Sequence, residues 1–575
     1  MREQWLAIEQ GSDVWQLPEL DGTPGQAELH IEVMRRSDDL PAIETINDVL
    51  ARYQDHISLN RLRQHWIQLA MQNDDWNLIV QLYRPGDNTA SECSYRLART
   101  QTGVDQPRSA HHLYVNGAQG GSCQRFLTLA QSKDWISDWS RSERVKVLLT
   151  QNRFGEAIEL ARSLGPKNTQ RAKAYALARQ NPSEYLARYP NGESRTQAIR
   201  SLIGQDPTGA ARWIRAQDTD LREWQAVHFI LDDHPDTATV LESLRRPLKT
   251  RSLREWEIRY HLRHQRWTQV AQRIDELPAS LRSSSAWQYW RGMAAAQLNQ
   301  PNPYWRGIAK RLDYYGMLAA DQLNQPYSTL RPNHRDAGSV ATLLNRYPVQ
   351  IAKALLDAGL DSRARSQWRW VFNQFTLSEK QAATELAQQW GWSSEEVRGA
   401  VNSRQTDTLH MYPDALRRVM QNREVDEDWL LGLTRTESLF QIDVRSRAGA
   451  LGLMQIMPAT GKKQAQRMGI AWQGSTTLVD PQVNVNLGSD YLAQMYQQFG
   501  YNALVASAAY NAGPNAVQRW LNQPDMDPAI WVETIPFKET RNYVKKVMAA
   551  ATIYNQALGG RDRRLSDRMT PLPKN

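Results

Sequence analysis

Three segments in the first half of the chain repeat one pattern of hydrophobic positions. Each begins with an aromatic residue, and apolar residues follow at the third, fourth and seventh positions; the segments begin at Trp76, Phe154 and Trp267. This spacing places the apolar side chains on one face of a helix. The starts are 78 and 113 residues apart, which is roughly two and three units of about 38 residues, a period typical of stacked helical hairpins. We therefore predict an irregular α-superhelix.

Alternating apolar and polar runs, which are typical of strands, are scarce along the whole chain, so the fold is expected to be all-α or nearly so. Pro326, Pro332 and Asn333 mark a break near 325–335, and the polar segment at 403–413 marks another. These breaks predict three parts: an α-superhelical domain over 1–330, a small helical linker domain over 331–405, and a C-terminal domain over 406–575.

Composition supports a globular protein of several domains. The chain has 575 residues, of which 41% are hydrophobic and 23% charged, so it exceeds one compact core and is not disordered. The mean hydropathy is −0.64. No uncharged apolar run approaches the roughly 20 residues that a bilayer crossing needs, so we expect no membrane span.

The net charge of +9 suggests an anionic partner, such as nucleic acid, anionic lipid or an acidic cell-wall polymer. A solvated basic surface explains the charge equally well. The basic residues are dispersed, with no run of five or more like charges, so nucleic-acid binding has little support.

Histidine and cysteine usage restricts the chemistry. Two cysteines cannot form a Cys-rich zinc site, and the last histidine is His410. The 165 residues after it therefore contain neither a Ser-His-Asp triad nor a zinc-binding histidine helix. Cys93 and Cys123 are either a disulfide, which implies an oxidising compartment, or two buried thiols. The segment Met1–Gln10 lacks the apolar core of a secretory signal, so the protein is either cytosolic or had a signal that was removed.

The segment VDEDWLLGLTRTESLF carries the candidate acid. Asp426 is a good N-cap, and helix periodicity then places Leu430, Leu433 and Glu437 on one face. A carboxylate therefore ends an apolar stripe, where burial is expected to raise its pKa. A raised pKa is what a general acid at neutral pH needs. The alternative is a glutamate at a helix end that faces solvent.

Polar and flexible residues follow the acid. In GALGLMQIMPATG, Gly449 and Gly452 permit a tight backbone path, Gln455 can offer a neutral amide, and Met454 and Met457 can form adaptable apolar walls.

The later segments predict two further helices at the site. Pro458 is expected to begin a helix, Asn502 to cap another, and Gly513-Pro514 to end it. In the same region Tyr510 and Asn511 present a phenol and an amide. Farther on, the i, i+4 spacing places Glu539 and Tyr543 on one helix face.

These blocks resemble the lysozyme-like catalytic domain of lytic transglycosylases. Four matches occur in family order over roughly 412–557: Glu437-Ser438, Gly452-Leu453-Met454-Gln455, Ala509-Tyr510-Asn511-Ala512-Gly513, and Pro536 to Tyr543 with Glu539-Thr540. The rest of the chain looks like the large soluble type of this family, in which Tyr314-Tyr315-Gly316 also fits. Leu439 after Ser438, and Gln441 after Phe440, depart from the family pattern.

The resemblance implies a ring-like or U-shaped superhelix, a linker domain and a lysozyme-like catalytic domain. It implies a lyase that cleaves the β-1,4 bond between N-acetylmuramic acid and N-acetylglucosamine in peptidoglycan without water and leaves a 1,6-anhydro end. Glu437 would act first as acid and then as base, with no metal and no cofactor. Asp443, six residues later, is interpreted as a turn or cap residue, so the N-acetyl group of the substrate would stabilise the developing cation.

The resemblance also implies roles for the surrounding residues. Ser446 would lie near the N-acetyl group, Tyr510 would steady Glu437 through its phenol, and Glu539 would hold the site from the opposite helix. Asn511 is expected to be structural. The complete expected substrate-binding set is Ser446, Gly452, Leu453, Met454, Gln455, Met457, Tyr510, Asn511, Glu539 and Tyr543.

By the same resemblance, Cys93 and Cys123 form a disulfide, and the protein is a periplasmic monomer of a Gram-negative bacterium that acts on glycan strands. Docking of cell-wall synthases on the superhelix is a hypothesis. Two alternatives stay open: a goose-type lysozyme-like hydrolase that uses the same acid with water, and a non-catalytic helical scaffold that binds cell wall.

Overall fold

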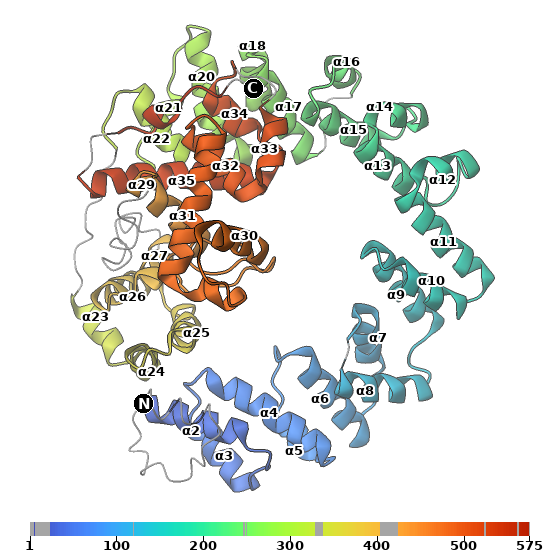
Figure 1. Cartoon of the computed structure of the whole chain (residues 1–575). Helices are drawn as coiled ribbons and strands as arrows, with labels where there is room; N and C mark the ends of the chain where they lie inside the picture. Colours follow the sequence, from blue (N-terminus) through green and yellow to red (C-terminus); the bar gives the residue numbers. More distant parts are fainter. Residues whose placement is uncertain are drawn as a thin grey trace. The chain divides into compact units, whose positions relative to one another are not determined.

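A computed structural model describes residues 5, 8, 24–118, 120–244, 248, 250–327, 337–402, 424–521, 525–559 and 563–573. Helices and their connections account for this part of the chain (Figure 1). Within it the only β-type pairing is two isolated bridges, Arg445 with Leu451 and Leu451 with Ile456. The prediction of an all-α protein is confirmed.

The chain divides into two compact units. The first unit comprises 1–228 and 344–374. Its helices are α2 Pro24–Arg36, α3 Ile43–Arg52, α4 Ser58–Gln72, α5 Trp76–Leu82, α6 Thr89–Gln101, α7 Pro107–Asn116, α8 Gly121–Ser132, α9 Asp138–Thr150, α10 Phe154–Arg162, α11 Pro166–Gln180, α12 Pro182–Arg188, α13 Arg195–Gln205, α14 Pro207–Ala210, η2 Ala211–Trp213, most of α15 Thr219–Leu231, α24 Tyr347–Asp357 and α25 Asp361–Phe372.

The second unit comprises 229–343 and 375–575. Its helices are α16 Thr237–Glu242, α17 Arg251–Arg263, α18 Trp267–Asp275, α19 Ala279–Arg282, α20 Ser285–Gln297, α21 Tyr304–Ile308, α22 Tyr314–Gln322, α23 Ala337–Leu344, α26 Leu377–Gln389, α27 Ser393–Asn402, α29 Glu427–Ser438, α30 Pro458–Met468, η4 Ser475–Val479, α31 Pro481–Gln498, α32 Ala503–Ala512, α33 Pro514–Trp520, α34 Pro528–Thr534, α35 Lys538–Ala557 and η5 Ser566–Arg568.

All three segments with the repeated hydrophobic pattern are helices that begin at the aromatic residue. They are α5, α10 and α18. Their apolar faces are buried, as Ile79 in α5, Ala157 in α10 and Val270 in α18 illustrate. Each helix packs on its neighbours in the chain, α5 on α4 and α6, α10 on α9 and α11, and α18 on α17 and α20. This local packing is typical of the predicted α-superhelix.

The segment 344–374 packs against the N-terminal helices within the first unit. Gln367, fully buried, donates from its amide to the Asp55 carbonyl at 2.8 Å and accepts from the Ile57 amide at 2.9 Å. Arg363 forms a 3.0 Å ion pair with the buried Glu32 carboxylate. Residues that are more than 300 positions apart in the sequence therefore provide the hydrogen-bond partners for one another's buried polar groups.

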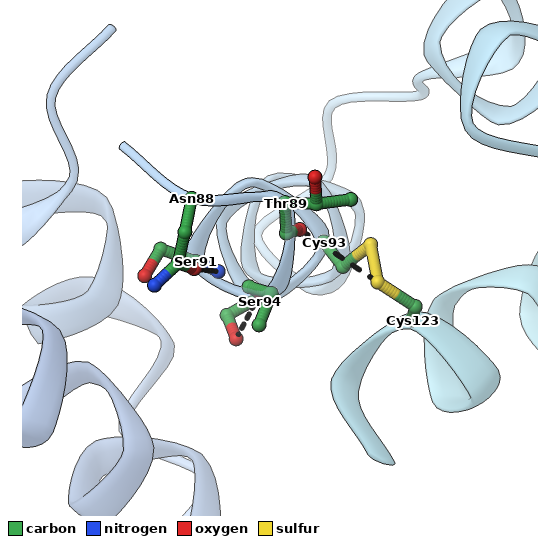
Figure 2. The surroundings of a disulfide bond; sticks show 7 residues. Asn88, Thr89, Ser91, Cys93, Ser94 and Cys123 are labelled. Atoms are coloured by element: carbon green, nitrogen blue, oxygen red, sulfur yellow. Dashed lines mark hydrogen bonds between the residues drawn. A yellow bond between two sulfur atoms is a disulfide. The ribbon is translucent and has the colours of Figure 1, made fainter. Parts of the chain in front are cut away.

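Cys93 of α6 and Cys123 of α8 form a disulfide (Figure 2), which confirms the predicted pairing. Their Cα atoms are 4.8 Å apart, and both residues are fully buried. In the same helix as Cys93, the Asn88 side chain caps the N-terminus by accepting from the Ser91 amide at 2.9 Å. The bond therefore joins two helices that already pack together in the core of the first unit.

The tryptophans that the sequence places beside charged residues have different environments. Trp256 is buried, and Trp135 is partly buried against the core of the first unit, so both side chains contribute to the packing of helices. Trp139 and Trp224 are instead 62% and 45% exposed. Packing therefore explains only part of this group.

Both predicted domain boundaries fall largely on residues outside the described ranges, at 328–336 and 403–423. The division into three domains therefore stays a prediction. Among the described helices, none combines the length and the apolar composition that a membrane crossing requires.

In the second unit, one continuous hydrophobic core includes residues from α17, α20 and α22 and from α29, α31, α32 and α35. Helices from 251–322 are therefore packed together with α29, which contains the candidate acid, and with the neighbouring helices α31, α32 and α35. The candidate acid therefore lies on a helix that is part of this shared core.

We expect removal of the disulfide to lower the free energy of unfolding of the first unit by about 3–4 kcal/mol, because the bond closes a loop of about 30 residues. Urea unfolding with and without a reductant measures this difference. A Cys93→Ala, Cys123→Ala double variant is the control, since its midpoint should not respond to reductant. Equal midpoints for oxidised and reduced wild type would contradict the expectation.

Candidate active site

The α29 helix brings a carboxyl group to the end of a buried apolar face. Leu430 and Leu433 have no exposed surface, and Glu437 lies on the same face one turn farther on, partly buried. Asp426 occupies the N-cap position as predicted, but its side chain makes no capping hydrogen bond. It instead forms a 2.8 Å ion pair with Arg563, because the capping role competes with a charged partner from the C-terminal segment.

The closest packing of α29 is with α35. At Gly432 a Cβ atom would lie 2.7 Å from the Ala551 nitrogen and 2.9 Å from the Val547 carbonyl oxygen. A side chain at this position would therefore force the two helices apart. Gly432 costs helix propensity but allows the backbones of α29 and α35 to touch.

The Tyr543 side chain of α35 binds the acid. Its phenol donates a hydrogen bond to Glu437 Oε1 at 2.6 Å. Burial raises the pKa of Glu437 to about 7; the Tyr543 hydrogen bond lowers that pKa, and the negative charge of Glu539 raises it. The prediction of a raised pKa is confirmed, and Glu437 can therefore hold a proton near neutral pH.

Tyr510 has a different partner from the one that the sequence suggested. Its phenol donates to the backbone carbonyl of Met454 at 2.8 Å, and the hydrogen bond to Glu437 comes from Tyr543 instead. Burial, followed by the negative charge of Glu437, raises the pKa of the Tyr510 phenol well above its usual value. Tyr510 therefore lies near the acid while it fixes the loop beside it.

The loop 439–457 is held by a tight set of backbone contacts. Gly452 has φ +78°, and a Cβ there would lie 2.2 Å from Asn484 Nδ2 and 2.3 Å from the Leu478 carbonyl oxygen. The buried Asn484 side chain accepts from the Met454 amide at 2.8 Å and donates to the carbonyls of Leu451 and Leu478. The Gly452 position tolerates only glycine because backbone and amide meet there without a side chain between them.

The surroundings of two loop residues restrict their expected roles as substrate contacts. The Gln455 amide nitrogen donates to the carbonyls of Val444 and Gly452 at 3.0 and 2.9 Å. Its carbonyl oxygen is therefore the group that this side chain can offer to a ligand. Met454 is fully buried, whereas Met457 is 43% exposed and is available as an apolar wall.

Ser446 and Asn511 make hydrogen bonds within the protein. The Ser446 hydroxyl accepts from the Ala450 amide at 2.9 Å, and Asn511 accepts from the Thr540 hydroxyl at 2.7 Å. The expectation that Asn511 is structural agrees with this contact. Leu453 is fully buried.

Two of the other carboxylates in this part of the chain, Asp443 and Glu539, are exposed. Glu539 and Tyr543 lie one turn apart on α35, as predicted. Neither exposed carboxylate shares the partly buried, hydrogen-bonded environment of Glu437. The described residues contain no group of three or more His, Cys, Asp or Glu side chains that could hold a metal ion.

The predicted helix limits at the site are confirmed. Pro458 begins α30, and the Asn502 side chain caps α32 by accepting from the Val505 amide at 3.0 Å. The α32 helix ends before Gly513-Pro514. These limits follow from local capping chemistry, which the sequence displays directly.

Two residues that shape the site, Asn484 and Gly432, are not among the residues predicted from the sequence. Asn484 is a polar residue among apolar ones, four residues after Asp480, where the sequence Asp-Pro indicates the start of a helix. Gly432 is a small residue that interrupts the apolar helix leading to Glu437. A polar or small residue on an apolar helix face often marks a buried hydrogen bond or a close helix contact.

Three family models match the chain. The transglycosylase SLT domain matches 414–530, the soluble lytic transglycosylase helical domain matches 534–562, and the soluble lytic murein transglycosylase L domain matches 342–409. A soluble lytic murein transglycosylase from Salmonella typhimurium is 26% identical over 541 residues, which cover 88% of this chain and 83% of the relative.

Solved structures are similar over nearly the whole chain. The lytic transglycosylase Slt from Pseudomonas aeruginosa, crystallised as an inactive glutamate-to-glutamine mutant, has a TM-score of 0.80 and 26% identity and covers 99% of this chain and 96% of its own. The 70 kDa soluble lytic transglycosylase from Escherichia coli has a TM-score of 0.84 at 24% identity, covering 99% and 98% of the two chains, and supports the fold alone.

We expect Gly452→Ala to lower the free energy of unfolding by about 3 kcal/mol or more, because backbone strain and overpacking act together. Gly449→Ala is the matched control. Gly449 also has a positive φ, +94°, but its nearest neighbour would lie 4.0 Å away, so only strain of about 1 kcal/mol applies. Calorimetric melting of both variants checks the difference, and equal losses would contradict it.

Proposed function

We propose that this chain is a soluble lytic transglycosylase, like the family models and relatives that it matches. It cleaves the β-1,4 bond between N-acetylmuramic acid and N-acetylglucosamine in peptidoglycan, and no water takes part. The observation that supports this reaction is the environment of Glu437. It is a partly buried carboxyl group with a pKa of about 7, hydrogen bonded by a phenol. Such a group can donate a proton and then accept one at the same pH.

The reaction has two proton transfers through one carboxyl group. In the first, Glu437 donates its proton to the glycosidic oxygen as the bond from C1 to that oxygen breaks. In the second, the Glu437 carboxylate takes the proton of the muramic acid 6-hydroxyl as O6 bonds to C1. The product carries a 1,6-anhydro ring, no water is consumed, and Glu437 is protonated again.

A retaining glycosidase places a second carboxylate about 5–5.5 Å from its acid to form a covalent intermediate. The family resemblance gives neither of the exposed carboxylates, Asp443 and Glu539, the role of that nucleophile. We therefore propose that the N-acetyl group of the substrate stabilises the positive charge at C1. Tyr543 supports the carboxylate stage, because its phenol stabilises the charged form of Glu437.

The remaining predicted site residues receive proposed roles that fit their environments. Met457 is exposed and can contact a sugar ring. Gln455 can accept a hydrogen bond through its carbonyl oxygen, and Tyr510 holds the backbone of this loop. Ser446 at the loop turn is proposed to lie near the N-acetyl group.

We also propose that the protein acts in the periplasm of a Gram-negative bacterium. The disulfide supports an oxidising compartment, and the relatives that it matches include soluble lytic murein transglycosylases of such bacteria. The division into domains at 1–330, 331–405 and 406–575, the monomeric state and the docking of cell-wall synthases stay predictions.

The first test compares the wild type with Glu437→Gln on purified peptidoglycan, with products identified by mass spectrometry. We expect products that are one water lighter than hydrolysed muropeptides, and their loss in the variant. Because a charged Glu437 is unfavourable when buried, the neutral glutamine should not lower the melting temperature, so inactivity would not reflect unfolding. Hydrated reducing ends would instead identify a hydrolase, and no soluble product would support a scaffold.

The second test measures pH dependence. Catalysis needs the protonated acid, so kcat/KM should fall as the pH rises through about 7, the pKa of Glu437 in the free enzyme. Tyr543→Phe removes a hydrogen bond that lowers this pKa, so the falling limb should move to higher pH by about one unit. A limb that moves to lower pH, or does not move, would contradict the role of Tyr543.

A further inference from the structure

A buried cluster of charges in the second unit surrounds Glu533 of α34. The Glu533 side chain is 1% exposed. Its carboxylate accepts hydrogen bonds from Lys545 of α35 at 2.5 Å, from Arg259 of α17 at 2.9 Å, and from the Tyr315 phenol of α22. Arg259 also donates to the Glu533 backbone carbonyl at 3.1 Å. One carboxylate therefore joins four helices from two distant parts of the chain.

Aromatic rings complete the cluster. The Trp256 ring has two guanidinium groups against it, Arg259 at 5.0 Å and Arg541 at 5.1 Å from its centroid. Lys545 lies 4.8 Å from the Tyr315 ring centroid. Cations that contact both a carboxylate and an aromatic ring are restricted in more than one direction. The cluster therefore fixes geometry rather than only adding stability.

The groups that face Glu533 can be named from every helix around it. They are Arg259 of α17, Tyr315 of α22, and Arg541 and Lys545 of α35. Glu255 of α17 lies behind Arg259, 3.7 Å from its guanidinium group. Burial alone would raise the pKa of Glu533, but Lys545, Arg259 and Arg541 hold it well below its usual value, at about 2. Glu533 is therefore a permanent anion at the centre of the cluster.

The α35 helix connects this cluster to the acid. Arg541 and Lys545 are one turn apart and lie on one side of α35. Glu539 and Tyr543 are also one turn apart, but each precedes its counterpart in the first pair by two residues. Two residues correspond to a rotation of about 200° around a helix, so the second pair lies on the opposite side. One side of α35 is therefore tied to Glu533, and the opposite side presents the Tyr543 phenol to Glu437.

We infer that Glu533 is a positioning residue, which holds α35 through Lys545 so that the Tyr543 phenol stays in hydrogen-bonding distance of Glu437. Arg259 and Tyr315, from 251–322, are the fixed points against which Glu533 is placed. A hydrogen bond of 2.6 Å tolerates little displacement of its donor. The helices that precede the catalytic region thus set the proton affinity of the acid; this inference rests on the proposed function.

The sign of a pKa change separates this inference from a direct electrostatic effect. Replacing Glu533 by glutamine removes a negative charge, which by itself would lower the pKa of Glu437. A displaced Tyr543 phenol would raise that pKa, because its hydrogen bond favours the charged form. Tyr315→Phe removes a hydrogen bond to Glu533 without changing any charge, so it tests positioning alone and is the milder substitution if Glu533→Gln fails to fold.

The experiment measures the pH profile of kcat/KM, together with kcat and KM, for Glu533→Gln, Tyr315→Phe, Tyr543→Phe and the two double variants with Tyr543→Phe. We expect each single positioning variant to move the falling limb to higher pH by roughly half a unit to one unit, and to lower kcat about 3- to 10-fold with KM within about 2-fold. In the Tyr543→Phe background Tyr315→Phe should leave the limb in place, because its effect passes through Tyr543. Glu533→Gln should there retain only its direct charge effect, which moves the limb to lower pH.

The control is Asp87→Asn, which breaks the buried ion pair with Arg63 in the first unit. It should lower the melting temperature without moving the limb. The inference is overturned if the limb moves to lower pH in either single variant, if it stays in place in Tyr315→Phe, or if an upward shift adds to that of Tyr543→Phe. An NMR titration of the Glu437 carboxyl gives the same comparison without activity. Failure of the proposed function is distinct, since it would appear as an active Glu437→Gln or as hydrated products.

Discussion

The close contact between α29 and α35 determines the surroundings of Glu437. Glu437 is suited to the proposed role of an acid because it is partly buried and has one phenolic partner, and both properties come from the close approach of these two helices. The approach is possible because Gly432 has no side chain, so the backbone of α35 lies directly against α29. A larger residue there would separate α29 from α35 and expose Glu437 to more solvent. The raised pKa is therefore a consequence of packing between backbones.

The loop after α29 also depends on a glycine that lets two parts of the backbone approach closely. It returns to the acid through Gly452, where the Asn484 amide and the Leu478 carbonyl occupy the position of a side chain. Leu439, Phe440 and Gln455 also have positive φ, a conformation that residues other than glycine adopt at a cost of about 1–3 kcal/mol. Asn484 and Tyr510 offset this cost through hydrogen bonds to the loop backbone. Strain and its compensation therefore lie together beside Glu437.

The helices that precede the catalytic region are part of the same assembly in the second unit. Their residues share a hydrophobic core with α29 and α35, and the Glu533 cluster adds directional contacts to that core. Hydrophobic packing alone holds a helix against its neighbours but lets it slide by small distances. Hydrogen bonds between charged groups also specify how the helix is rotated and where it lies along its axis. This combination explains how a single phenol can be kept 2.6 Å from a carboxylate.

The helices and the candidate acid could be predicted from residues that lie close together in the chain. The repeated apolar pattern located α5, α10 and α18, capping residues located the ends of α30 and α32, and the apolar stripe identified Glu437, because each of these depends on residues within a few turns of one another. Tertiary structure decided which tyrosine binds the acid, what Asn484 holds, and that the Gln455 amide nitrogen is already used. Tyr543 and Glu437 are 106 residues apart, and such a contact is set by how helices pack, a property that no local spacing in the sequence records.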